Sequence, residues 1–204
     1  MDTNALFTIG HSTRDITDFT ALLMENRVTA VADVRSSPYS RHFPHFNMDA
    51  LKDSLRRCQV QYVFLGEELG ARRAEPECYI NDVARYELIA KTQAFESGLN
   101  RLRRGMQSHR IALMCAEKDP LTCHRTILVC RQLREECNIS HIIDHGVVED
   151  HASAETRLLR LTGLPDRALF DDRQEYLEEA YEKQGNEIAC RRGLLKSVNP
   201  REGE

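Results

Sequence analysis

The chain contains no tryptophan, and aromatic residues make up only 6% of its 204 residues. Proteins that bind single-stranded nucleic acid use aromatic side chains, set among basic ones, as stacking platforms. No aromatic-rich basic motif of that kind is present. The net charge of −4 also excludes a strongly basic coat. A local basic cleft remains compatible with this value, because the distribution of charge matters more than its sum.

Long apolar runs are also missing: none approaches the roughly 18 residues that a membrane-spanning helix needs. The N-terminal stretch "MDTNALFTIGHS" lacks the basic and apolar regions of a signal peptide. Seven cysteines, an odd number spread along the chain, are atypical of a secreted disulfide framework. We therefore predict a cytoplasmic protein with no membrane partner.

Apolar runs alternate with segments of helical periodicity over the first 145 residues. Strands are predicted at 6–12, 28–35, 60–69, 110–117 and 139–144. Helices are predicted at 15–27, 47–59, 83–105 (with a break near Gly98) and 122–137. This alternation predicts an α/β fold of three layers, with a mostly parallel sheet of about five strands and helices on both faces. Two further helices, at 153–162 and 173–189, form a helical C-terminal tail. The length suits one domain, 1–204, with a core at 5–146 and an extension at 149–192 packed on it.

In sheets of this kind, ligands bind beyond the carboxyl ends of the strands. The segments at those ends read "GHSTR", "DVRSSPYSR", "GEELGARR", "CAEKDPLTCHR" and "DHG". They hold a large share of the cysteine, histidine, carboxylate and arginine side chains of the chain. A crevice lined by several guanidinium groups suits an anion, since arginine forms paired hydrogen bonds with phosphate or carboxylate.

Cys115 and Cys123 differ from the other cysteines because both lie at this edge. Cys123 is predicted at a helix start, with Thr122 as N-cap, where the helix dipole and nearby cations lower a thiol pKa. Either thiolate is a candidate nucleophile, with His124 and Glu117 as proton carriers and Arg125 as an anion-binding group. In the alternative interpretation Cys123 only caps the helix and Arg125 pairs with Glu117. Cys58, Cys130, Cys137 and Cys190 are predicted to be structural.

A metal site is the other chemistry to weigh here. Cys115, Cys123 and His124 offer three zinc ligands. The spacing C-x7-C-H is not a familiar zinc pattern, adjacent residues rarely bind one tetrahedral ion together, and the chain has no CxxC pair. We therefore predict no metal and no cofactor.

Five segments resemble one known family: "TIGHSTR", "VADVRSSPYSRHFPHFN", "QYVFLGEELGARR", "ALMCAEKDPLTCHR" and "EEAYEKQGNEIACRR". Their order is similar to that of the bacterial family called domain of unknown function 488 (DUF488), over residues 6–192. The one departure is Ala71, where the family pattern has a second glycine. The resemblance implies one domain with the tail packed on it, and it supplies no activity. It carries over the motif positions Gly10, His11, Ser12, Asp33, Arg35, Pro38, Ser40, Arg41, Cys115, Glu117, Cys123, His124 and Arg125.

The leading hypothesis is therefore a cysteine-dependent transferase or hydrolase that acts on an anionic substrate containing phosphate, either a nucleotide or nucleic acid. The candidate catalytic residues are Cys115, Glu117, Cys123, His124 and Arg125. The candidate anion-binding residues are His11, Ser12, Arg14, Asp33, Arg35, Tyr39, Ser40 and Arg41. One alternative is a sulfur-transfer enzyme, because "VADVR" followed by a later strand-end cysteine is similar to the rhodanese pattern. The other is a non-catalytic module that binds nucleotide or nucleic acid and has structural cysteines.

Overall fold

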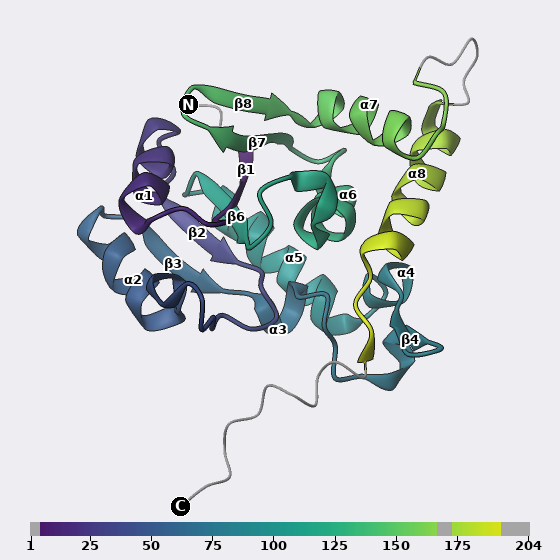
Figure 1. Ribbon diagram of the computed structural model, residues 1–204, viewed down its shortest axis with the longest axis horizontal. Coiled ribbons are helices and arrows are strands. Elements are labelled where there is room, and N and C mark those ends of the chain that lie inside the picture. Colours follow the sequence, from purple (N-terminus) through teal and green to yellow (C-terminus); the bar gives the residue numbers. More distant parts are fainter. Residues whose placement is uncertain (1–4, 167–172, 193–204) are drawn as a thin grey trace, which may run out of the picture.

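The computed structural model describes residues 5–166 and 173–192, and its centre is a six-stranded sheet (Figure 1). The strands are β1 (Ala5–Gly10), β2 (Ala30–Asp33), β3 (Gln61–Phe64), β6 (Ile111–Cys115), β7 (Asn138–Asp144) and β8 (Val147–Asp150). Their order is β3-β2-β6-β1-β7-β8, and only β8 is antiparallel to its neighbour. The predicted α/β class with a mostly parallel sheet is confirmed. The additional strand, β8, follows a tight turn at Gly146, where φ is +65°.

Helices cover both faces of the sheet, as the near-continuous apolar runs of β1, β2 and β6 require. On one face α1 (Ile16–Glu25) and α2 (Met48–Arg57) pack against side chains such as Phe7 and Ile9 of β1. On the other face lie α5 (Gln93–Met106), the π-helix η4 (Arg125–Cys130) with α6 (Arg131–Leu133), α7 (His151–Leu161) and α8 (Arg173–Ile188). Leu6 of β1 points to this second face. The tail helices α7 and α8 thus share a core with the sheet, and their bounds agree closely with prediction.

The segment predicted as a strand at 60–69 changes structure in its middle. Strand β3 ends at Phe64, and α3 (Gly66–Leu69) follows as a single helical turn. A Cβ atom at Gly66 would lie 2.0 Å from the carbonyl oxygen of Arg35, so only glycine fits here. The prediction of an uninterrupted strand was wrong, because the chain turns where the backbone passes the end of β2.

The segment predicted as one helix at 83–105 holds three elements. Val83–Ala84 is the short strand β5, paired with β4 (Tyr79–Ile80), which follows the 3-10 turn η2 (Pro76–Cys78). After it, α4 (Tyr86–Ile89) and α5 are separated at 90–92, where the hydroxyl of Thr92 accepts a hydrogen bond from the backbone N–H of Phe95. The expected break near Gly98 was wrong. Gly98 lies inside α5, where a Cβ would come within 2.7 Å of the Leu69 side chain.

The segment predicted as a helix at 122–137 begins later than expected. A 3-10 turn, η3 (Pro120–Thr122), precedes the helix. Asp119 caps this turn, because its carboxylate accepts a hydrogen bond from the backbone N–H of Leu121. Thr122 lies inside the turn, and His124 occupies the N-cap position of the π-helix, so Thr122 is not the N-cap. Asn47 begins α2 as predicted, after the 3-10 turn η1 (Pro44–Phe46). Among the described residues, no helix has the length and apolar character needed to cross a membrane.

Candidate functional site

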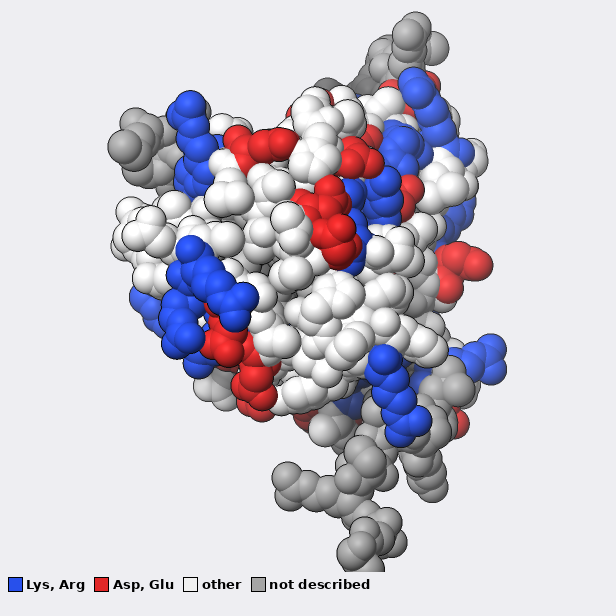
Figure 2. Space-filling model, turned by 60° about the vertical axis from the view of Figure 1, so that its left-hand side comes forward, with Lys and Arg blue, Asp and Glu red and all other residues white. Residues whose placement is uncertain are grey.

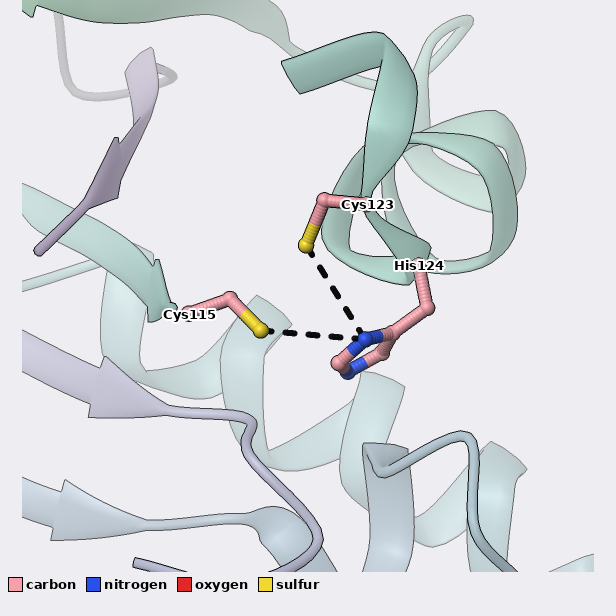
Figure 3. A group of neighbouring side chains, drawn as sticks. All are labelled: Cys115, Cys123 and His124. Carbon is pink, nitrogen blue, oxygen red and sulfur yellow. Dashed lines mark hydrogen bonds between the residues drawn. The ribbon is translucent and has the colours of Figure 1, made fainter. Parts of the chain in front are cut away.

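Two sulfur atoms and one imidazole nitrogen meet at the carboxyl end of β6 (Figure 3). The Sγ atoms of Cys115 and Cys123 lie 3.8 and 3.9 Å from Nδ1 of His124. All three atoms fall within 4.8 Å of one another. Both cysteines are buried, and all seven cysteines of the chain are free. We call Cys115, Cys123 and His124 the sulfur–imidazole cluster.

The backbone explains how adjacent residues reach one point. Cys123 is extended, with φ −135° and ψ 139°, whereas His124 is already helical, with φ −60° and ψ −24°. This change of conformation between neighbours turns both side chains toward Cys115. The helix that follows opens as a π-helix, a rare form that often marks functional sites.

The contacts of His124 fix its neutral tautomer. Its Nε2 lies 2.9 Å from the carbonyl oxygen of Val34, so this nitrogen carries the proton and donates it. The lone pair of Nδ1 then faces the two sulfur atoms. A carbonyl partner of this kind is what orients the histidine ligands of metal ions and the imidazoles that accept protons.

Arg125 lies directly behind the cluster and is fully buried. Its guanidinium group donates to the carbonyl oxygens of Glu117 (2.7 Å) and Lys118 (3.0 Å) and to the hydroxyl of Thr8 (3.3 Å). Its backbone N–H points at the sulfur of Cys123, 3.5 Å away. Among the described residues, no carboxylate forms an ion pair with Arg125. The predicted anion-binding group is thus engaged inside the protein, where its charge favours a thiolate at Cys123.

The pKa values of the three cluster residues shift in different directions. Burial opposes ionisation of Cys123, but the hydrogen bond with Cys115 and the charge of Arg125 hold the pKa of Cys123 well below its ordinary value. The hydrogen bond with Cys123, together with burial, raises the pKa of Cys115 well above its ordinary value. Burial works against the imidazolium of His124, yet the hydrogen bond with Cys123 raises its pKa. These shifts favour a thiolate at Cys123 over one at Cys115.

The cluster borders a cavity of about 370 Å³, which we call the cleft. Its walls are formed by Arg35, Ser36, Ser37, Tyr39, Ala71, Arg72, Tyr86, Cys115, Ala116, Glu117, Thr122, Cys123, His124, Ile188 and Cys190. Glu117 faces this space, where burial and the nearby Cys123 raise its pKa. Gly10 keeps the Glu117 loop in place, because a Cβ on Gly10 would lie 1.8 Å from the Glu117 carbonyl oxygen.

A second buried arginine, Arg35, forms part of the cleft wall and is paired with Asp33. Its Nε and one terminal nitrogen lie 2.9 and 2.6 Å from the two Asp33 oxygens. The Tyr62 hydroxyl donates to the same carboxylate at 2.8 Å. The other terminal nitrogen lies 3.4 Å from Nε2 of His11. Burial and the Arg35 charge lower the pKa of His11 to about 4, so its ring is neutral.

The remaining predicted anion-binding residues lie at different distances from the cleft. Tyr39 is in its wall and exposed. Ser12 follows β1, where its backbone N–H donates to the Ala116 carbonyl oxygen. Ser40 receives a hydrogen bond from the backbone N–H of Phe43, and Arg41 is exposed. Neither of the last two contributes to the cleft wall.

Arg14 serves the fold instead of the cleft. Its guanidinium donates to Asp18 at 2.8 Å and to the carbonyl oxygen of Ile143 at 2.6 Å. These bonds tie the start of α1 to the end of β7.

Cys190 and Tyr86 line the cleft, and neither was predicted from the sequence to lie there. Cys190, predicted to be structural, lines the cleft together with Cys115 and Cys123. Arg72, one of the arginines of the predicted strand-end segment "GEELGARR", is exposed at the cleft, and its backbone N–H donates to the hydroxyl of Ser36. Tyr86 comes from α4. For Cys190 a signal existed, because it belongs to "EEAYEKQGNEIACRR", one of the segments that carry the family resemblance.

One face of the surface is seen in Figure 2. There the basic groups are separated by acidic and uncharged areas, and they do not merge into one continuous patch. This face gives no support for a broad contact with a nucleic-acid backbone.

A family model, "Domain of unknown function DUF488", matches residues 15–131. The chain belongs to the DUF488 family. The matched range includes β2, β6 and the whole sulfur–imidazole cluster, whereas the Gly10–Ser12 motif and the tail lie outside it. Comparison with curated proteins and with solved structures gives no match.

Proposed function

We propose that this DUF488 protein is an enzyme that acts on an anionic, phosphate-containing substrate of nucleotide size, with the sulfur–imidazole cluster as its reactive centre. One observation carries the proposal: two sulfurs and an imidazole nitrogen converge at the edge of a cleft whose walls also hold guanidinium and hydroxyl groups. Convergence of reactive groups on one cavity is typical of catalytic sites.

We assign two roles to the residues of the cleft: binding of the substrate anion and the chemical step. Arg72, Ser36 and Tyr39 lie in the wall and are the groups we assign to the substrate anion. Glu117, with its raised pKa, is the candidate general acid. In the metal-free chain Cys123 is the candidate nucleophile, because its pKa is lowered. Its sulfur accepts a hydrogen bond from the backbone N–H of Arg125 and also contacts Cys115 and His124.

The test is turnover of pooled nucleotides and other phosphate esters, followed by phosphorus NMR, for the wild type and two variants. C123S is expected to lower the rate by about 100-fold or more, the scale on which a reactive group contributes. C58S is the matched control, because Cys58 is partly exposed and lies outside the cleft. Undiminished turnover in both C115S and C123S would remove the cluster from the mechanism.

A second candidate, sulfur transfer, is favoured by the two neighbouring sulfurs. Attack of the Cys123 thiolate on the outer sulfur of thiosulfate would release sulfite and form a persulfide, and Cys115 lies beside it to accept the outer sulfur as the Cys123 thiolate leaves. Incubation with thiosulfate and cyanide tests this directly: formation of thiocyanate that C123S abolishes would favour it over phosphate chemistry.

The non-catalytic alternative has its own signature. A binding module would retain nucleotide affinity in C115S and C123S, and its affinity for nucleic acid would fall steeply with salt. That result, without turnover of any substrate in the pool, would overturn the proposed enzyme.

A further inference from the structure

Three side-chain atoms in the cleft have the arrangement of a metal site with one ligand missing. A zinc ion takes sulfur ligands at about 2.3 Å and imidazole nitrogen at about 2.0 Å, so its tetrahedral ligand atoms lie roughly 3.5 to 3.8 Å apart. The two S···N separations of 3.8 and 3.9 Å nearly meet this spacing. The third separation, between the sulfurs, is at most 4.8 Å.

We propose that Cys115, Cys123 and His124 bind one thiophilic divalent cation, with Zn²⁺ the best match, and that its fourth position opens into the cleft. Two thiolates and an imidazole select a soft or borderline ion over Mg²⁺ or Ca²⁺. Three protein ligands with one open position are the pattern of catalytic zinc sites, whereas structural zinc sites carry four.

The orientation of His124 supports this assignment independently of the distances. Its Nε2–H donates to the Val34 carbonyl oxygen, which leaves Nδ1 as the ligand atom and fixes the plane of the ring. Metal-bound histidines almost always have such an outer partner. Cys123 also has an outer partner, the backbone N–H of Arg125.

No metal was predicted from the sequence, because the C-x7-C-H spacing is unfamiliar, no CxxC pair is present, and adjacent residues rarely share one tetrahedral ion. The extended conformation of Cys123 beside the helical His124 removes the last of these objections, because that change directs both side chains to the same point.

Charge also favours a cation here. Binding of Zn²⁺ releases the thiol protons and leaves two thiolates, one dication and the buried Arg125 guanidinium, a net charge of +1. A site with that charge, open to a cleft whose wall includes the exposed Arg72, attracts an anion to the fourth position. In the ion-loaded chain both sulfurs are ligands, and Cys123 is then not free to act as a nucleophile. The ion would be the reactive group instead. This role in turnover rests on the proposed function, whereas binding of the ion does not.

The test uses cobalt as a spectroscopic probe on the full chain, prepared under reducing conditions and stripped with a chelator. We expect one Co²⁺ per chain, with a sulfur-to-cobalt charge-transfer band that Zn²⁺ abolishes. C115S, C123S and H124N should each weaken binding by more than the roughly 10- to 100-fold that loss of an outer partner costs. C58S should bind as the wild type does. C190S is a second control, because Cys190 lines the cleft but is not one of the proposed ligands. This variant should also retain the charge-transfer band.

A measurement on the wild type alone tests the metal site even if the variants do not fold. Zn²⁺ should protect Cys115 and Cys123 from alkylation, read by peptide mass, while Cys58 continues to react. Absence of the charge-transfer band in the wild type, or Zn²⁺ binding without protection of these two cysteines, would overturn the metal site. Metal binding without turnover of any phosphate substrate would leave the site standing and overturn the proposed function, and turnover by a chain that binds no metal would do the reverse.

Discussion

Two buried polar regions meet at Thr8 of β1, and they differ in how completely their hydrogen bonds are satisfied. The first is the sulfur–imidazole cluster with Arg125. The second is a chain of donors and acceptors that joins Thr8, His141, His151, Tyr181, Glu155 and Arg134. Thr8 belongs to both, because its hydroxyl accepts from Arg125 Nε at 3.3 Å and lies 2.8 Å from Nδ1 of His141.

The second region is closed. One tautomer of each histidine lets every group donate to the next: Thr8 to His141, His141 to His151, and His151 to the Tyr181 hydroxyl, at 2.8, 3.0 and 3.0 Å. Tyr181 then donates to Glu155, which forms an ion pair with Arg134. A network with every member satisfied rigidifies the fold and leaves no group free for a ligand.

The first region is open. Its sulfurs contact Nδ1 of His124 only at 3.8 and 3.9 Å, and the charge of its cation, Arg125, lowers the pKa of Cys123. The comparison teaches that histidine in a buried network does not by itself indicate function. The open region differs from the closed one in the incomplete satisfaction of its sulfur and imidazole groups.

The largest expected effect comes from removing the cation of the open region. In R125M the Glu117 and Lys118 carbonyl oxygens lose their donor, and we expect a loss of about 3 kcal/mol in the free energy of unfolding, since a hydrogen bond to a charged group contributes about 1.5 kcal/mol or more. Urea unfolding measures it. R41M, at an exposed position, should stay within about 0.5 kcal/mol of the wild type. Equal effects of the two changes would mean that Arg125 does not hold the Glu117 loop.

An intermediate effect is expected where the regions join. T8V keeps the shape of the side chain but leaves Arg125 Nε and His141 Nδ1 without their shared partner, at a cost of about 2 kcal/mol. Because Thr8 belongs to both networks, T8V and R125M should be non-additive in a double-mutant cycle. Simple addition of the two losses would show that the regions are energetically separate.

Much of the fold followed from the sequence, because apolar periodicity reports burial directly. It identified the five parallel strands and both tail helices. It failed at "VFLGEEL", where a four-residue strand and a four-residue helix are too short for their periods to differ. Strand β8 was missed because its pairing depends on the turn at Gly146.

The site followed from the sequence only in part. Placement of Cys115 and Cys123 at strand and helix ends came from the rule for parallel sheets. The convergence with His124 depends on a backbone change at one residue and on a π-helix, neither of which leaves a local pattern. Cys190 reaches the cleft from the far end of the chain, so no spacing rule could include it.

The smallest expected effect is the dependence of the closed region on pH. Burial lowers the pKa of both His141 and His151, so both rings are neutral in the folded protein. The unfolded chain binds protons near the ordinary histidine pKa of about 6.5. These two groups therefore contribute stability above that pH, and the contribution is lost as the pH falls below it. His145, whose pKa is raised by its hydrogen bonds to Asp18 and Glu25, changes stability in the opposite direction.

Urea unfolding at pH 7.5, 6.5 and 5.5 separates these contributions when it is made in the H145Q background. Between pH 6.5 and 5.5 we expect each buried histidine to remove at most about 1 kcal/mol, because one pKa unit corresponds to 1.36 kcal/mol. H151Q in the same background should flatten the pH dependence by about that amount, whereas H42Q, at an exposed position, should leave it unchanged. If H151Q and H42Q behave alike, the closed region does not exclude protons, and its difference from the open cluster disappears.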